Sequence, residues 1–368
     1  DEVRSRVTAL TRDLILIPST EARPAERRRA IEFIANHLDA LEGVRVDRFE
    51  SNGFASLVAR PVDCRTPDIL MCGHIDVVEH PHMETYGSTI VDDRIVGPGA
   101  GDMKGAVAII LELFRHWQSQ RPGVSLGLAI TSDEERGGAD GLRYLVHEQG
   151  LRCGRAIIPD GGSLNDLTVE EKGVLHVRLL SRGHAAHAAR PWLADNALRR
   201  LMRCVGRIDA QFQKQTPESI QPDGDHWFTT CTLTIVRTSN QTINRVPDEA
   251  EAVLDIRFPP PESVESMVER LASLTGPDVQ VEPIMVAEPT HLDPDPLFGQ
   301  VTEQVTGQPV RLVKASGGSD ARFLCPFGIP VNLSRPRVGN LHAEDEWIDV
   351  ESMVAYYRVC DEYLRRKL

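Results

Sequence analysis

The sequence predicts an α/β protein in which a larger domain, with a mixed, mostly parallel sheet flanked by helices, carries a smaller inserted α+β domain. Two observations lead to this prediction. Short apolar stretches near 68–73, 124–131 and 156–158 alternate with helix-like segments, which is typical of a sheet with helices on its faces. Near residue 173 the pattern changes to longer stretches of alternating apolar and polar residues, and the first pattern returns after Pro289.

The larger domain is expected to comprise residues 1–173 and 289–368. Two helices are expected within 1–41, the second from about Ala25, with a break at Ile17-Pro18-Ser19-Thr20 between them. The other expected elements are, in order, strands near 44–49, 55–60 and 68–73, a helix from about Lys104 to Trp117, a strand from Val124 to Thr131, a helix from Gly141 to Glu148, a strand from Ala156 to Ile158, strands near 309–314 and 330–334, and a helix from Val350 to Leu368.

The inserted domain is expected to comprise residues 174–288. Its elements are, in order, a strand from Val174 to Leu180, a helix over about 194–213, strands at 230–237 and 249–257, a helix over about 262–274 and a strand at 278–286. This β-α-β-β-α-β order is that of a ferredoxin-like sandwich, which can fold as a self-contained unit.

Composition excludes several classes of partner. A length of 368 residues favours two domains, and 41 basic against 54 acidic residues give a net charge of −13, which argues against nucleic acid or an anionic membrane. The longest apolar runs, such as Gly105 to Leu113, are too short to span a bilayer. The 7 cysteines are scattered and form no C-x-x-C pair, and no secretion signal opens the chain, so we expect a cytoplasmic protein.

A histidine and an aspartate mark the end of one apolar strand. His74 and Asp76 are two residues apart, so their side chains should project from the same face. A metal-bound imidazole needs an acceptor for its second nitrogen, and a carboxylate at this spacing is well placed to be one. The alternative is a core histidine satisfied by a neighbour. Glu79, His80 and His82 fall in the polar loop beyond and are assigned no metal.

Further acidic and histidine residues follow other predicted strands. These are Asp102, the pair Glu134 and Glu135, Asp160 and His342. Taken singly, each acidic residue is more often a solvated loop residue or a helix cap. Together, the two histidines, the two aspartates and one glutamate of the pair suit two divalent metal ions that share one carboxylate, with zinc the first choice and cobalt or manganese as alternatives.

Five motifs in order resemble the M20 metallopeptidase family, whose catalytic domain is zinc-peptidase-like. They are Gly73-His74-Ile75-Asp76-Val77, Gly99-Ala100-Gly101-Asp102-Met103-Lys104-Gly105, Ser132-Asp133-Glu134-Glu135, Pro159-Asp160-Gly161-Gly162 and the late His342. The resemblance covers nearly the whole chain. It implies one metal on His74, Asp102 and Asp160 and the other on Asp102, Glu135 and His342, with Asp102 as the bridge. It also implies that Asp76 orients His74, that Glu134 is the general base, and that the Asp102–Met103 peptide bond is cis.

The inserted domain resembles the lid and dimerisation domain of the same family. The segment from Gly183 to Pro191 matches the lid motif, with His187 at the position that reaches the partner subunit's site in dimeric members. The resemblance therefore implies a homodimer formed through the lid. Asn244 and Arg257 fall at substrate-contacting positions, although Arg257 could instead pair with Asp255. Two further glycines, Gly317 and Gly318, resemble the segment that lines the substrate pocket.

The expected activity is that of a metal-dependent amidohydrolase acting on a small molecule. The resemblance favours an N-acyl amino acid substrate of the deacetylase, desuccinylase or aminoacylase type, with metal-activated water and Glu134 as the base. A dipeptidase or aminopeptidase of the same family is the alternative, because aspartate at the position of Asp160 is frequent in that branch, where many deacylases have glutamate. A binding protein that kept the fold without catalysis is a further alternative, although all the expected metal ligands are present.

Overall fold

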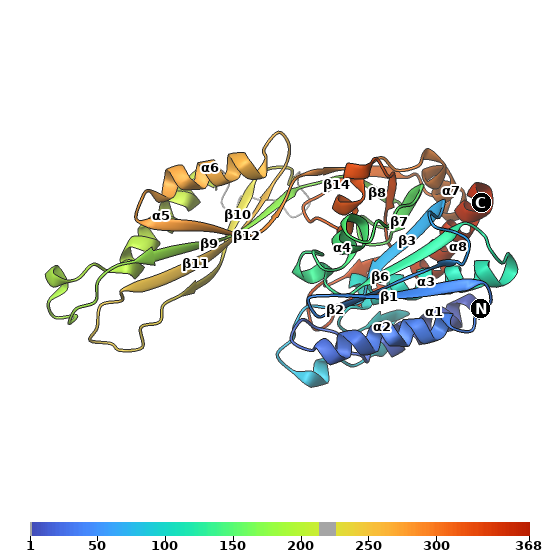
Figure 1. Ribbon diagram of the computed structural model, residues 1–368, viewed down its shortest axis with the longest axis horizontal. Helices are drawn as coiled ribbons and strands as arrows, with labels where there is room; N and C mark the ends of the chain where they lie inside the picture. Colours follow the sequence, from blue (N-terminus) through green and yellow to red (C-terminus); the bar gives the residue numbers. More distant parts are fainter. Residues whose placement is uncertain (1, 213–225) are drawn as a thin grey trace. The chain divides into compact units, whose positions relative to one another are not determined.

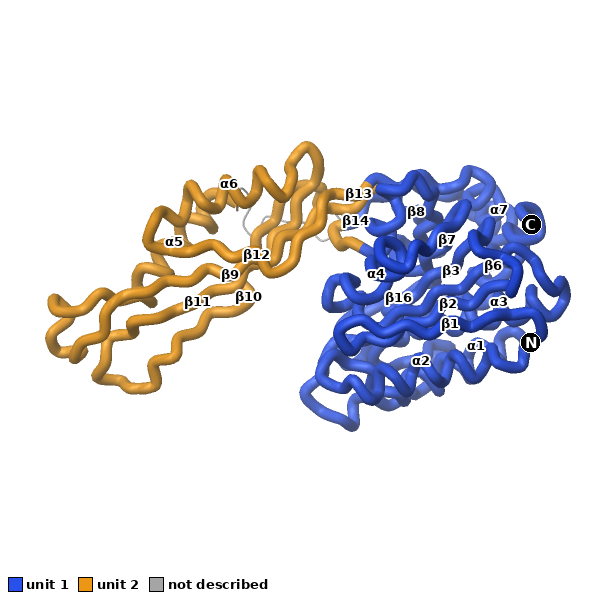
Figure 2. The backbone as a smooth tube through the Cα atoms, viewed as in Figure 1, with its two compact units in different colours: residues 1–169, 291–315, 319–368 blue, residues 170–290, 316–318 orange. Residues whose placement is uncertain are grey.

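The computed structural model describes residues 2–212 and 226–368, so residue 213 of the expected helix over 194–213 lies outside it (Figure 1). The chain forms two compact units (Figure 2). Unit 1 comprises Asp1–Val169, His291–Ala315 and Ser319–Leu368, and unit 2 comprises Glu170–Thr290 and Ser316–Gly318. The sequence-based boundaries at 173 and 289 differ from these by a few residues, and the short 316–318 segment was not expected in the insert.

Unit 1 is organised around a mixed sheet with the strand order β1-β2-β6-β3-β7-β15. The strands are β1 (Val44–Ser51), β2 (Phe54–Pro61), β3 (Ile69–His74), β6 (Leu126–Thr131), β7 (Arg155–Ile158) and β15 (Val331–Leu333). The pairs β6–β3, β3–β7 and β7–β15 are parallel, whereas β1–β2 and β2–β6 are antiparallel. The mixed α/β fold is thus confirmed. The carboxyl ends of four parallel strands meet at one edge, where α/β sheets place their ligands.

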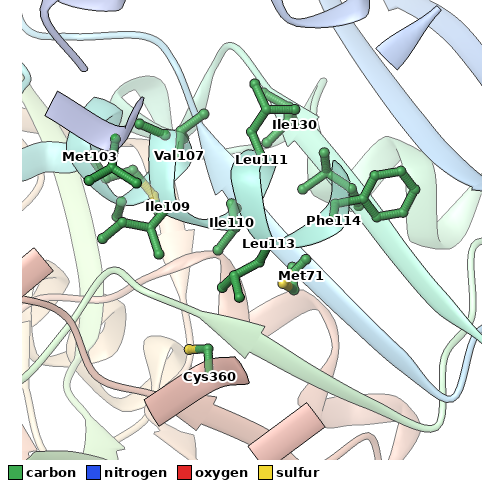
Figure 3. Close-up of a cluster of buried hydrophobic side chains, with 14 of the residues drawn as sticks. Met71, Met103, Val107, Ile109, Ile110, Leu111, Leu113, Phe114, Ile130 and Cys360 are labelled. Atoms are coloured by element: carbon green, nitrogen blue, oxygen red, sulfur yellow. The ribbon is translucent and has the colours of Figure 1, made fainter. Parts of the chain in front are cut away.

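Helices cover both faces of this sheet. They are α1 (Glu2–Ile15), α2 (Pro24–Leu38), α3 (Gly105–Gln120), α4 (Leu142–His147), α7 (Pro296–Thr306) and α8 (Val350–Lys367). Residues 105–114 of helix α3 are buried and, apart from Glu112, apolar. Met71 of β3, Ile130 of β6 and Cys360 of α8 lie in the same core (Figure 3). On the other face, α4 packs on alternate β3 residues such as Leu70. No described helix is long and apolar enough to cross a membrane.

Several elements outside the two larger sheets were not predicted. They are the helix α7, the strand β8 (Asp166–Glu171), the strand β13 (Thr290–His291), and the small sheet of β4 (Thr89–Val91), β5 (Arg94–Val96), β16 (Val338–Gly339) and β17 (Trp347–Asp349). The predicted strand near 309–314 is β14 (Arg311–Ala315), which pairs with β8. Helix α7 did carry signals, since Asp295 caps it, Pro296 opens it and Gly307 ends it at φ 69°. The strands of two or three residues are too short to show a period.

Unit 2 has the predicted β-α-β-β-α-β order. Its elements are β9 (Gly173–Arg182), α5 (Ala197–Phe212), β10 (Thr230–Arg237), β11 (Glu249–Phe258), α6 (Val264–Thr275) and β12 (Val279–Ala287). The sheet order is β10-β11-β9-β12, with every neighbouring pair antiparallel. Alternate residues of β9 and β11 are buried against α5 and α6, and this separate core matches the alternating pattern seen in the sequence.

Candidate active site

Six of the predicted site residues lie at the carboxyl-end edge of the unit 1 sheet. His74 is the last residue of β3, the two adjacent glutamates follow β6 and Asp160 follows β7. Asp102 lies in the irregular turn that leads into α3, and His342 lies in the loop between β16 and β17. Four separate loops therefore supply side chains to one place. The parallel directions of β3, β6 and β7 explain why His74, the two glutamates and Asp160 converge there.

Asp102 lies between the two histidines. His74 Nε2 is 3.1 Å from Asp102 Oδ1, and His342 Nε2 is 3.7 Å from Asp102 Oδ2. His74 Nε2 is also 3.9 Å from Asp160 Oδ2, and His342 Nε2 is 3.3 Å from Glu135 Oε2. The Asp102–Met103 peptide bond is cis, as the family resemblance implied. One carboxylate with an oxygen toward each histidine has the position required of a bridging ligand.

These side chains form two groups whose ligand atoms lie within 4.8 Å of one another. One group is Asp102, Glu135 and His342, which is one of the implied metal sites. The other contains His74 and Asp160, but its third member is Glu134 rather than Asp102. Glu134, the predicted general base, therefore lies close enough to His74 and Asp160 to serve as a metal ligand itself. Which of the two adjacent glutamates binds metal stays a prediction that substitution can decide.

Asp76 fixes two neighbours at once. Its Oδ1 is 3.4 Å from His74 Nδ1, and its backbone oxygen is 3.2 Å from the same nitrogen. Its Oδ2 accepts a hydrogen bond of 2.9 Å from the backbone N–H of Glu135. Burial opposes protonation of His74, but hydrogen bonds with Asp102 and Asp76 outweigh it and raise the pKa of His74 well above its usual value. Asp76 therefore orients the imidazole of His74 and fixes the backbone of Glu135 in the turn Glu134–Arg136.

The buried carboxylates make this edge favourable for cations. Burial raises the pKa of Glu134 well above its usual value; His74 opposes this shift and Asp160 adds to it. Burial, followed by the negative charge of Asp102, raises the pKa of Asp160 in the same way. Carboxylates held together away from water are costly without positive charge, and oxygen and imidazole ligands are those of zinc and similar ions. The residues present therefore fit bound divalent metal.

Glu346 is a site residue that the sequence analysis missed. Its Oε1 accepts hydrogen bonds from the backbone N–H groups of Gly101 (2.7 Å) and Asp102 (2.8 Å), and its Oε2 accepts one from His342 (3.3 Å). Burial raises its pKa to about 7. Glu346 thereby ties the backbones of two predicted ligands together. The sequence placed it beside Glu344 and Asp345, which are exposed, and nothing in that run distinguished the buried member.

Replacement of Glu346 by glutamine should weaken metal binding. The amide keeps one acceptor oxygen but turns an N–H₂ group toward a backbone donor, so one of the two ligand loops loses its anchor. Loss of such a supporting contact typically lowers metal affinity by about 10- to 100-fold. Competition with a chelator would measure this affinity, and Glu344→Gln is the exposed control that should behave as wild type. A folded Glu346→Gln protein with unaltered affinity would show that the anchor is dispensable.

The remaining predicted residues belong to unit 2. They are His187, Asn244, Arg257, Gly317 and Gly318. His187 is exposed, and its Nδ1 accepts a hydrogen bond of 3.1 Å from the backbone N–H of Ala189. In the neutral ring the proton then lies on Nε2, which is available as a donor. Arg257 makes the ion pair with Asp255 that was the alternative to a substrate role, at 2.6 and 3.0 Å. Roles of these residues at the unit 1 site stay predictions.

The fold and the two groups of histidine and carboxylate ligands define a metal-binding α/β enzyme. Comparison with protein families gives the particular group. The model of peptidase family M20/M25/M40 matches residues 70–366, and the chain belongs to this family. It is accordingly a metal-dependent hydrolase of amide bonds, as its motifs indicated.

Individual relatives and solved structures agree with this assignment. Succinyl-diaminopimelate desuccinylase of Xanthobacter autotrophicus is 30% identical over 95% of this chain and 96% of its own length. An M20 family metallo-carboxypeptidase from Sulfolobus solfataricus has a TM-score of 0.78 at 18% identity, covering 98% of this chain and 99% of that one. A dipeptidase from Saccharomyces cerevisiae has a TM-score of 0.76 at 15% identity, and the match covers 99% of this chain and 98% of that one. The structures support the fold, whereas the sequence relative bears on activity.

Proposed function

We propose that the protein hydrolyses the amide bond of an N-acyl amino acid and releases the free amino acid. The strongest support is the two neighbouring groups of possible metal ligands, with Asp102 between the two histidines and Glu134 in the group of His74 and Asp160. The similarity to a succinyl-diaminopimelate desuccinylase over nearly the full length favours a deacylase of that type. His74, Asp102 and Asp160 would hold one divalent cation, and Asp102, Glu135 and His342 the other. Such a pair supplies Lewis-acid chemistry, in which water becomes more acidic and the substrate carbonyl is polarised.

The chain's own residues would move the proton and stabilise charge. Glu134 takes a proton from the attacking water as its oxygen bonds to the carbonyl carbon. It then delivers this proton to the amine nitrogen as the carbon–nitrogen bond breaks. A raised pKa suits a carboxylate that must accept and then donate near neutral pH. His187, with its proton on Nε2, would donate a hydrogen bond to the oxyanion of the tetrahedral intermediate.

Unit 2 is proposed as a lid and as the dimerisation domain. Its ferredoxin-like sheet leaves β10 at one edge, and Leu233, Ile235 and Val236 of this strand are exposed. An exposed apolar edge strand is a common place for a second chain to pair. A homodimer formed here would allow His187 to serve the partner's site, and Asn244 and Arg257 would contact substrate when the lid closes.

A panel of substrates tests the proposed reaction. Metal-loaded protein should hydrolyse N-acetyl or N-succinyl amino acids with a higher kcat/KM than unmodified dipeptides. Chromatographic measurement of the free amino acid that is released gives kcat/KM for both classes of substrate. Preference for dipeptides would favour the dipeptidase alternative, which the aspartate at position 160 supports through the family resemblance. Absence of hydrolysis of either class by metal-loaded protein would contradict the proposal.

Metal analysis should find two divalent ions per chain at full loading. The motivation is the pair of ligand groups, since a single tetrahedral zinc with its water needs only about three of these side chains. Elemental analysis after titration with zinc, cobalt or manganese measures the stoichiometry, and removal with a chelator should abolish turnover until metal is returned. Protein that never binds more than one equivalent would contradict the paired site.

A further inference from the structure

An arginine of unit 1 points at the metal-ligand cluster without a hydrogen-bonding partner there. Arg335 Nη1 lies 3.7 Å from Asp160 Oδ1 and 4.0 Å from Asp102 Oδ2. Both distances exceed the usual N–H···O range of about 2.7–3.2 Å. Its Nε is buried and has no hydrogen-bond partner among the described residues. The side chain as a whole is 15% exposed, so water has only limited access to the guanidinium.

The local fold explains why Arg335 reaches this place. Strand β15 pairs in parallel with β7, and the last pair in register is Leu333 with Ile158. Arg335 and Asp160 each lie two residues beyond that pair, at the same edge of the sheet. Pro336 follows Arg335, and a residue before proline is restricted to extended conformations, so the chain continues in the strand direction. The guanidinium is thus carried to the site by the sheet.

A role as a fixed counterion for the carboxylates is unfavourable at this position. Asp102 and Asp160 are two of the predicted metal ligands, and a guanidinium held beside them repels the cations that they would bind. The buried and unpaired Nε–H group is also costly. Both costs are removed when a planar oxyanion enters the site, since the guanidinium fork pairs two N–H groups with two carboxylate oxygens.

We propose that Arg335 recognises a carboxylate of the substrate, as a specificity-determining residue supplied by the catalytic unit itself. This inference rests on the proposed amide hydrolysis. A substrate of that class has a carboxylate on the amine side in an N-acetyl amino acid, on the acyl side in an N-succinyl amide, or on both. The proposed role needs only one carboxylate near the scissile bond. The experiment below shows whether it is the carboxylate on the amine side or the one on the acyl side.

Four compounds derived from one amino acid with an uncharged side chain distinguish recognition of the amine-side carboxylate from recognition of the acyl-side carboxylate. They are the N-acetyl amino acid, its carboxamide, the N-succinyl amino acid and its carboxamide. Arg335→Gln should lower kcat/KM about 10- to 100-fold, mainly through KM, for compounds with the recognised carboxylate. The N-acetyl carboxamide, which has no carboxylate, should change less than about twofold, because it never used the guanidinium pair. Arg335→Lys should recover part of the loss, since a point charge remains without the fork.

Arg337 provides a matched control two residues away. Its Nη2 pairs with Asp349 Oδ1 at 3.0 Å, and its side chain is 57% exposed. Arg337→Gln should therefore leave kcat/KM unchanged for all four compounds. Metal content should be retained in Arg335→Gln. A loss confined to compounds with the amine-side or with the acyl-side carboxylate supports the proposal and identifies the side. An equal loss on all four compounds, or no loss on any, overturns it.

A binding measurement keeps this test independent of turnover. Calorimetric titration of the metal-loaded Glu134→Gln protein with the same compounds should show carboxylate-dependent affinity, and the added Arg335→Gln change should remove it. If wild-type protein hydrolyses none of the compounds, the proposed reaction fails, while the titration still decides whether Arg335 binds a carboxylate. Equal affinity of the four compounds for the Glu134→Gln protein, or no change when Arg335 is replaced, would refute the role.

Discussion

Glu134→Gln is expected to lower kcat by about 10²–10⁴-fold, the usual contribution of a general base. The amide keeps the shape of the side chain but cannot accept the proton of the attacking water. Folding should be nearly unchanged, since the one ion pair of the Glu134 side chain among the described residues is a long contact of 3.9 Å to Arg322. Metal content should also persist if Glu134 is the base. Steady-state kinetics on fully loaded protein, with metal analysis of the same sample, would measure both quantities.

The adjacent glutamate is the control for this experiment. Glu135→Gln should lose metal at the group it shares with Asp102 and His342, and activity should fall together with metal content. The structure puts Glu134 within ligand distance of His74 and Asp160, so the two variants decide a question that distance leaves open. Loss of metal in Glu134→Gln, with retention in Glu135→Gln, would mean that the two roles are exchanged. Near-normal kcat in loaded Glu134→Gln would show that another group is the base.

His187→Ala is expected to lower kcat by about 10²–10³-fold, as loss of one oxyanion donor typically does. The orientation of its ring supports this role, because Nδ1 accepts from Ala189 and Nε2 is left to donate. His184 is exposed in the same loop, and His184→Ala should be close to wild type. Metal content should stay normal in both variants. A fully active His187→Ala enzyme would discard the role.

Mixed dimers test whether His187 acts on the partner's site. Chains with His187→Ala and chains with Glu134→Gln should each retain at most about 1% of wild-type kcat when alone. If His187 acts across the dimer, co-expression restores one site in each mixed dimer, or about a quarter of wild-type activity at equal amounts of the two chains. Activity that stays absent, although mixed dimers are isolated, would mean that each lid serves its own chain.

The sequence was most informative where a short-range rule determines position. His74 and Asp160 could be placed because apolar strands end beside them, and parallel strands bring such ends together. The unit 2 sheet was predictable because its two central strands, β9 and β11, each alternate over ten residues. The same rules failed for β16 and β17, whose two or three residues are too few to show a period, although their loop supplies His342.

The missed residues depend on contacts between distant parts of the chain. Glu346 is 244 or 245 residues from the backbone groups that it binds, so its sequence neighbours give no sign of the contact. Arg335 shows the same difficulty, because its significance lies in its distance to Asp102 and Asp160. In both cases the residue type is common on protein surfaces. Only burial at the sheet edge separates these side chains from ordinary solvated charges.

Unit 1 is built from segments on either side of unit 2, and this order matters during synthesis. The ribosome completes His74, Asp102, Glu135 and Asp160 before it begins unit 2, whereas His342 emerges only after unit 2. The edge strand β15 and the buried Tyr356 and Tyr363 of α8 are also late. Unit 2, with a continuous chain for its main sheet, is therefore the first part of the nascent polypeptide able to fold completely. Five of the six strands of the main sheet and four of the ligands are therefore synthesised before unit 2, and the second ligand group is complete only when His342 follows.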